Sequence, residues 1–186
     1  MELTKLIRER RSVHQFEDRP LSVEFVTELL DTAVWVPNHR MTQPWRFVII
    51  LGEGRQKLAE IVRKFREANE PDPEKAKEIG QKLYNKFMSV PMFIAVVLQV
   101  NANPTIAEED YASAACLIHN FSLLAWEKGI GMVWETYPLL KVEAFREAFG
   151  VKPGERIIGS LHTGYPGRIL SAQERIPAGE RLTVIE

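Results

Sequence analysis

The residues best suited to chemistry stand near the N-terminus, in the run Arg10-Arg11-Ser12-Val13-His14. Arginine presents a planar fork of N–H donors that matches phosphate oxygens, and a serine hydroxyl adds a compact donor. Basic residues in the last turn of a helix are also favoured by the helix dipole. On these residues alone the helix-end interpretation is the simpler one, and phosphate binding stays open.

A second polar stretch runs from Trp35 to Trp45 and contains Pro37 and Pro44. Two prolines stiffen a loop, and stiff polar loops are good ligand-binding elements. An ordinary helix-to-strand connection is the alternative. Packing does not explain Asn38, His39 and Gln43 together, so the set favours binding.

Other catalytic patterns are weak or missing. There is no Gly-x-Ser-x-Gly elbow, and no Rossmann or Walker glycine loop. Cys116 falls in an apolar helical stretch and is expected to be a small buried hydrophobe, with His119 a core histidine. The four histidines lack metal-ligand spacing, so no metal and no catalytic side chain is predicted. Phosphate-type donors without an acid–base set suggest that a cofactor carries the chemistry.

Composition limits the class of protein. The 186 residues suit one domain, 1–186, and 45% apolar residues can build a core. A net charge of -1 argues against a nucleic-acid partner. The longest apolar run, 90–98, is far below the roughly 18 residues that cross a bilayer. With one cysteine and no signal-peptide core at the N-terminus, the expectation is a soluble cytoplasmic protein without a membrane partner.

The hydrophobic pattern predicts alternating helices and strands. Helical spacing marks 3–7, 23–34, 58–65, 76–87, 107–128 and 142–149, and strand composition marks 45–51, 92–100, 131–136 and 156–161. Helix 107–128 is apolar nearly all round, which suggests burial against a second subunit. The tail, 169–186, has little core of its own and regains strand character only at 182–185, so it is either loose or laid across a partner.

Four motifs in order resemble the nitroreductase family of flavin enzymes, in particular its short YdjA-like NAD(P)H nitroreductases. They are Arg10-Arg11-Ser12; Pro37-Asn38-His39 with Gln43-Pro44-Trp45; Trp134-Glu135-Thr136; and Ala148-Phe149-Gly150 followed by Gly164-Tyr165-Pro166-Gly167-Arg168. Each motif alone is weak, but four in the right order and spacing are specific. The resemblance covers nearly the whole chain.

The resemblance implies an α+β, nitroreductase-like fold in which helices flank a central, mainly antiparallel sheet. It also implies an intertwined homodimer whose C-terminal tails cross to the partner, with two FMN molecules at the interface. A buried helix 107–128 and a core-poor tail would both follow from such a dimer.

Site roles carry over residue by residue. Arg10, Arg11 and Ser12 are expected to hold the FMN phosphate and ribityl chain, with Arg168 completing the phosphate site. His14 departs from the basic residue usual at its position. From the neighbouring subunit the resemblance implies Trp35, Asn38, His39 and Gln43; Trp35 replaces an arginine of short relatives and is expected to stack. The isoalloxazine would be lined by Trp134, Glu135 and Thr136, chiefly through backbone amides.

The activity implied is ping-pong hydride transfer from NADH or NADPH through flavin N5 to a nitroaromatic, a quinone or a similar small molecule. A flavin-binding or sensing module of the same fold, without turnover, is the alternative. The sequence does not distinguish NADH from NADPH, does not identify the acceptor, and gives the 54–89 helices no role.

Overall fold

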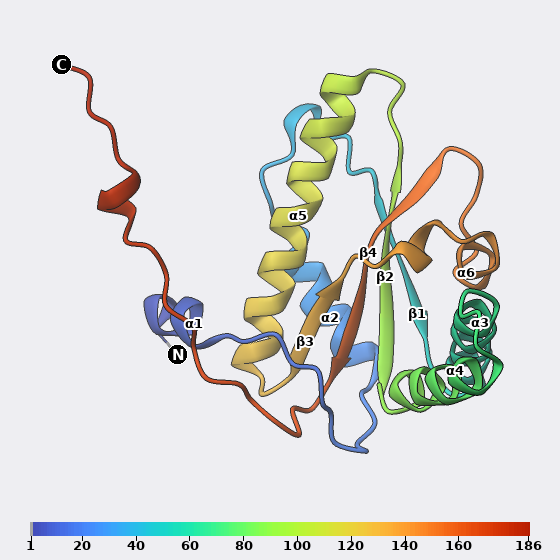
Figure 1. Ribbon diagram of the computed structural model, residues 1–186. Helices are drawn as coiled ribbons and strands as arrows, with labels where there is room; N and C mark the ends of the chain where they lie inside the picture. Colours follow the sequence, from blue (N-terminus) through green and yellow to red (C-terminus); the bar gives the residue numbers. More distant parts are fainter. Residues whose placement is uncertain (1) are drawn as a thin grey trace.

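The central strand of the protein is β2 (Met92–Gln99), whose residues 92–98 are all buried. In the computed structural model, which describes residues 2–186, it lies in a four-stranded sheet of order β1-β2-β4-β3 (Figure 1). The other strands are β1 (Trp45–Ile50), β3 (Gly131–Glu135) and β4 (Glu155–Gly164). All three strand pairings are antiparallel.

Helices cover both faces of this sheet. One face packs against α2 (Val23–Ala33) and α5 (Pro104–Glu127), and the other against α3 (Glu53–Ala68), α4 (Pro73–Met88) and α6 (Glu143–Ala148) (Figure 1). A short helix, α1 (Leu3–Glu9), lies beside the lower end of α5. The expected α+β arrangement, a mainly antiparallel sheet flanked by helices, is confirmed.

Local sequence signals set several helix ends. Ser22 caps α2 by accepting a hydrogen bond from the Phe25 amide at 3.2 Å. Asn103 caps α5, and Pro104 occupies its first position. Gly129 ends α5 with φ +75°, while the Ile130 amide donates to the Ala125 carbonyl at 2.8 Å. The C-terminal cap at Gly129 fixes where α5 ends and the chain turns toward β3.

The outer face of α5 is open in the single chain. Cys116 and His119 are both exposed on it. The expectations of a buried Cys116 and a core His119 are therefore wrong for the isolated chain, because these positions point away from α2 and the sheet. An apolar helix with an open face leaves room for another surface to pack there.

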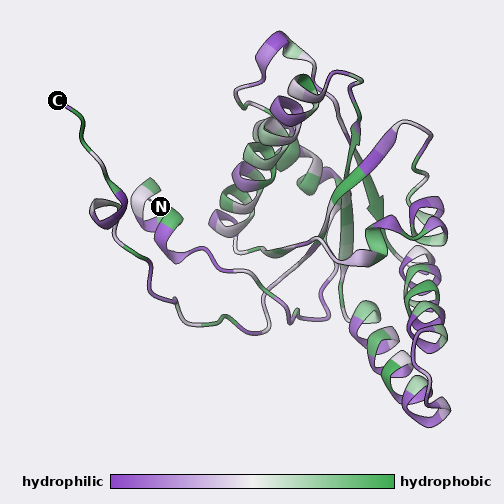
Figure 2. Cartoon of the chain, turned by 45° about the horizontal axis from the view of Figure 1, so that its top comes forward, coloured by the Kyte–Doolittle hydropathy of each residue, from purple (hydrophilic) through white to green (hydrophobic). Residues whose placement is uncertain are grey.

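The C-terminal tail runs away from the body of the molecule (Figure 1). Residues 167–186 are all exposed, and they include Ile176, Leu182, Val184 and Ile185 (Figure 2). A single turn of 3-10 helix, η3 (Ala178–Arg181), interrupts the tail, and no strand forms at 182–185. A strand needs a hydrogen-bonding neighbour, and the chain itself supplies none there.

Two further features can be stated for residues 2–186. No helix in this part of the chain is both long and apolar enough to span a bilayer. Within the same residues, no group of three His, Cys, Asp or Glu side chains is placed to hold a metal ion.

Candidate functional site

The arginine run leaves α1 and joins the edge of the sheet. Arg10 is the C-cap of α1, and Ser12 then pairs with Met132 of β3 in a parallel bridge. The Val13 amide donates to the Met132 carbonyl at 3.1 Å, and the Val13 side chain is fully buried. A Cβ on Gly131 would lie 2.4 Å from Val13 Cγ2, so this close approach requires glycine. The edge of β3 thus fixes Ser12 and its neighbours.

A basic hollow of about 680 Å³ opens beside this segment. Residues of α1, the arginine run, α5 and the tail line it: Ile7, Arg8, Arg10, Arg11, Ser12, His14, His119, Leu170, Ser171, Ala172, Gln173 and Arg175. Four of these side chains are arginines, and none is acidic. We call this space the basic hollow.

Arg10 and Arg11 have different partners. Arg11 Nη1 donates to the carbonyls of Arg8 at 2.6 Å and Arg10 at 2.8 Å. These hydrogen bonds satisfy backbone carbonyl groups at the C-terminal end of α1. Arg10 Nε is buried and has no hydrogen-bond partner. Burial, and then the charges of Arg11 and Arg175, lower the pKa of Arg10 below its usual value. A buried, unpartnered guanidinium N–H is costly, and an anion in the basic hollow would satisfy it.

The end of β3 offers backbone groups rather than side chains. Trp134 Nε1 donates to the Ile158 carbonyl at 3.1 Å, so the indole N–H is already used. Since the Met132 carbonyl faces Val13, alternation along the strand turns the Trp134 backbone groups to the same open side. His14 Nδ1 lies 3.9 Å from Glu135 Oε1, which brings the arginine run to the end of β3.

The loop of residues 38–43 is held by a polar network. Asn38 Oδ1 accepts from the Gln43 amide at 2.7 Å, and Asn38 Nδ2 donates to the hydroxyls of Thr42 and Ser113. The Thr42 hydroxyl in turn donates to Asp110, which is 3% exposed. Within one chain, Asn38 therefore shapes the loop.

This loop is also strained. Arg40, Met41 and Gln43 adopt φ of 63°, 49° and 41°, values rare for residues other than glycine. His39 Nδ1 lies 2.9 Å from Glu109 Oε2 on α5, while the Met41 side chain is mostly exposed. Strained backbone held by a buried network often marks a binding element.

The expected site residues fall into separate places within one chain. Arg10, Arg11, Ser12 and His14 line the basic hollow, and Trp134 and Glu135 lie at the neighbouring end of β3. The loop with Asn38, His39 and Gln43 contacts α5 around residues 109–113, near the opposite end of the helix from α1 (Figure 1).

Three further expected residues do not line the basic hollow of their own chain. Trp35 is 86% exposed, on a shallow surface formed with α1 and the C-terminal half of α5. Thr136 lines another pocket. Arg168 does not line the basic hollow of its own chain.

Among the lining residues of the basic hollow that were not expected from the sequence, three are arginine or histidine. Arg175 comes from the tail, Arg8 from α1 and His119 from α5. Arg175 lies close enough to act on the pKa of Arg10. In the sequence, Arg175 is one basic residue in a polar tail. No local pattern predicts that it lies near Arg10.

A buried polar pair lies behind the end of β3. The Tyr137 hydroxyl and His162 Nε2 are 3.2 Å apart, and Phe87 and Phe93 pack around the imidazole. Burial, with smaller effects of Lys86 and His14, lowers the pKa of His162 to about 3. Burial also raises the pKa of Tyr137. Both groups are therefore neutral near pH 7.

The fold and the basic hollow together define an α+β protein with a hollow lined by arginines at the edge of its sheet. Solved structures share this fold. A nitroreductase-like family protein from Bacillus cereus superposes with a TM-score of 0.88 at 35% identity, over 100% of this chain and 97% of that one. The "putative nitroreductase in complex with fmn" from Desulfovibrio desulfuricans gives a TM-score of 0.76 at 21% identity, over 100% of this chain and 98% of that one.

Sequence comparison gives the family. The profile of the "Nitroreductase family" matches residues 7–165. The "Putative NAD(P)H nitroreductase YfhC" of Bacillus subtilis is 37% identical over 182 residues, covering 97% of this chain and 93% of the relative. The chain belongs to the nitroreductase family, and the resemblance drawn from its four motifs is confirmed.

Proposed function

We propose that this protein is an FMN-dependent oxidoreductase that transfers hydride from NADH or NADPH to a nitroaromatic, a quinone or a similar acceptor, in a ping-pong sequence. The observation that carries the proposal is Arg10 Nε, buried without a partner in the basic hollow. The FMN complex of the Desulfovibrio relative and the NAD(P)H nitroreductase relative from Bacillus subtilis support the choice of cofactor and reductant.

The residues present fit the phosphate end of FMN. Arg10, Ser12 and Arg175 would hold a phosphate dianion, since charge-assisted hydrogen bonds from guanidinium groups are the strong ones. Arg11 has its Nη1 on the end of α1, so it would contribute mainly charge. His14, beside Glu135, would border the ribityl side.

The residues at the end of β3 fit the ring. FMN, when bound, would supply the two-electron redox chemistry between the nicotinamide and the acceptor. The open backbone groups of Trp134, with those of Glu135 and Thr136 beyond, would orient the ring edge. Trp134 itself is held by its bond to Ile158, so this edge is preorganised.

We also propose that residues 1–186 form one domain that works as an intertwined homodimer. The open face of α5, the exposed Trp35 and the apolar residues of the tail support a second copy as the missing partner. In that assembly the partner's loop, with Asn38, His39 and Gln43, would complete the site, and Trp35 would stack there. Arg168 would join the phosphate site once the tail is laid on the partner.

We place the enzyme in the cytoplasm, where reduced nicotinamide is available. The helices α3 and α4 lie on the opposite face of the sheet from α5, and we assign them no part in hydride transfer.

The test is a visible spectrum followed by anaerobic mixing. The purified protein should be yellow, or become so with added FMN, and its flavin absorption should bleach with NADH or NADPH. Adding a quinone or nitroaromatic should restore the colour. A colourless protein that takes up no FMN would overturn the proposal. A yellow protein that neither nicotinamide reduces would instead indicate a binding or sensing module.

A further inference from the structure

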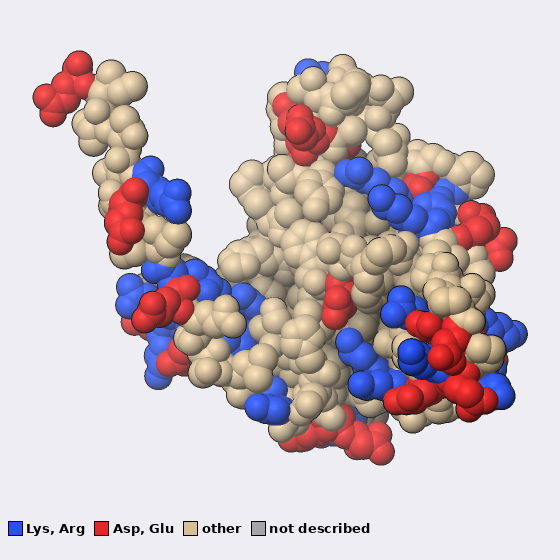
Figure 3. Space-filling model, in the orientation of Figure 1, with Lys and Arg blue, Asp and Glu red and all other residues tan. Residues whose placement is uncertain are grey.

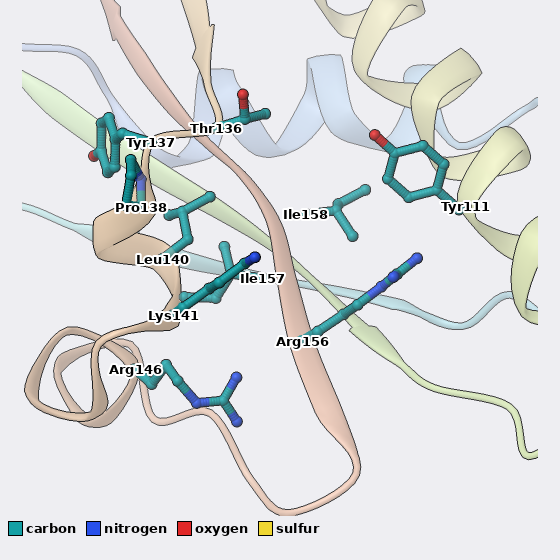
Figure 4. A pocket seen from close by; sticks show the side chains of 10 residues that line it. All are labelled: Tyr111, Thr136, Tyr137, Pro138, Leu140, Lys141, Arg146, Arg156, Ile157 and Ile158. Atoms are coloured by element: carbon teal, nitrogen blue, oxygen red, sulfur yellow. The ribbon is translucent and has the colours of Figure 1, made fainter.

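A second hollow lies where β3 ends and the 3-10 turn η2 (Pro138–Lys141) begins (Figure 4). Its volume is about 390 Å³, and it is lined by Tyr111, Thr136, Tyr137, Pro138, Leu140, Lys141, Arg146, Arg156, Ile157 and Ile158. We call it the cationic pocket.

The pocket exists because β3 is shorter than β4. β4 pairs with β2 from Glu155 to Thr163, but with β3 only from Ser160 to Gly164. One edge of residues 155–159 therefore has no strand beside it. The chain of η2 forms one wall over that edge and Tyr111 of α5 the other, with β4 as the floor (Figure 4).

The charge of the pocket is unbalanced. Lys141, Arg146 and Arg156 line it, and none of the lining residues is acidic. Arg146 is already engaged, since Nη2 donates to the Glu155 carbonyl at 3.3 Å and Nε lies 3.9 Å from Glu143. Among residues 2–186, no carboxylate pairs with Lys141 or Arg156. Figure 3 shows Lys and Arg gathered on this face, beside the start of β4.

The rest of the lining suits an aromatic ring. Pro138, Leu140 and Ile158 give apolar surface, and Tyr111 adds an aromatic ring with the Arg156 guanidinium 5.2 Å from its centroid. An apolar wall with a few convergent charged donors is the usual composition of a small-molecule site. Its volume suits a single substituted ring.

Position connects this pocket to the proposed flavin site. Thr136, which lines the pocket, directly follows the β3 residues proposed to border the flavin ring. We propose that the cationic pocket binds the electron acceptor, and that it selects aromatic acceptors carrying a carboxylate, which Arg156 and Lys141 pair with. This inference rests on the proposed function and gives its substrate class.

The experiment compares two acceptors that differ in charge and little in shape. Calorimetry on the FMN-loaded protein measures binding of 4-nitrobenzoate and of the neutral 4-nitrobenzamide. Wild-type protein should bind the carboxylate about tenfold more tightly, as a charge-assisted hydrogen bond adds that much. Arg156→Gln and Lys141→Gln should each lose most of this preference and leave the amide unchanged. Arg156→Lys should retain part of it.

The matched control is Lys77→Gln, which removes one exposed positive charge from α4 on the other side of the sheet. It should leave both affinities unchanged. Equal affinities of wild-type protein for the two ligands, or equal losses for both in the Arg156 and Lys141 variants, would overturn the inference. So would variants that weaken only NADPH binding, because the pocket would then serve the reductant.

The two proposals fail differently. Calorimetry needs no turnover, so the charge preference can be measured even if neither nicotinamide reduces the flavin. Loss of flavin reduction with the preference intact would contradict the proposed function alone. Normal turnover of a neutral quinone without any carboxylate preference would contradict the cationic pocket alone.

Discussion

Arg10 and Arg11 are neighbours in the sequence, but their guanidinium groups have different surroundings. Arg11 is bonded to carbonyls at the end of α1, which matches the helix-end interpretation of the run. Arg10 has a buried, unpartnered Nε, which matches the phosphate interpretation. The helix-end interpretation therefore applies to Arg11, and phosphate binding stays a prediction for Arg10.

This difference predicts unequal effects on cofactor binding. Arg10→Met should raise the FMN dissociation constant about 10- to 100-fold, because a charge-assisted bond is worth about 1.5–3 kcal/mol. Arg11→Met should have a clearly smaller effect. Quenching of FMN fluorescence measures both constants, and Arg10→Met should not lower the urea midpoint of FMN-free protein. Equal effects of the two substitutions would reject the assignment.

His162 makes folding stability depend on pH. Its folded pKa, about 3, lies below its ordinary value of 6.5, so between these values the unfolded chain binds a proton that the folded chain does not. The free energy of unfolding should therefore fall with decreasing pH across this window, by up to about 1.4 kcal/mol per pH unit. Urea unfolding at several pH values from 7 to 5 avoids most of the carboxylate titration.

A His162→Gln variant provides the comparison. It should lose the slope contributed by His162 between pH 7 and 5 even if its overall stability is lower. Glu155, whose pKa the Arg46 hydrogen bond lowers to about 2, adds its own loss only at more acidic pH. An unchanged slope in the His162 variant would show that other groups cause it.

At the scale of elements, the position of Trp134 at the end of β3 requires a glycine in the neighbouring strand β4. The Trp134 indole lies over Gly159, where a Cβ would come within 2.1 Å of Trp134 Nε1. The indole can donate to Ile158 only because this position is glycine. Gly159 therefore supports the strand end that is proposed to orient the flavin.

Gly159→Ala should consequently destabilise the protein by about 1–3 kcal/mol, as overpacking usually does. It should also weaken FMN binding, because the end of β3 must shift. Gly179→Ala is the matched control, since nothing lies within 4 Å of a Cβ there. Urea unfolding and FMN titration measure both effects. A variant as stable as the control would mean that Trp134 moves without cost.

At the scale of the whole molecule, the single chain leaves much apolar surface uncovered. Ile185 is 93% exposed, and Leu182 and Trp35 are similarly open. The tail contributes nothing to either core of its own chain. These features have a common physical explanation if a second copy covers them, since burial of apolar surface drives association.

The full chain should therefore sediment as a dimer of the 21.3 kDa subunit. Deleting residues 169–186 should shift it toward monomer and weaken FMN binding, because Arg175 is lost as well. Leu182→Ser with Ile185→Ser keeps Arg175, so any loss of FMN binding in this variant would come from the weakened dimer and not from the loss of Arg175. A full chain that sediments as a monomer would contradict the proposed assembly.

The sequence by itself determined the order of the main helices and strands and the family, because hydrophobic periodicity and ordered motifs are local signals. Only the tertiary structure shows that Arg175, and not Arg168, lies in the basic hollow with Arg10. It also shows that the 38–43 loop contacts the N-terminal half of α5, and that Cys116 and His119 are exposed. It also formed the cationic pocket from segments far apart in the chain. These placements depend on where β3 stops and on how the chain folds back, which no local pattern encodes.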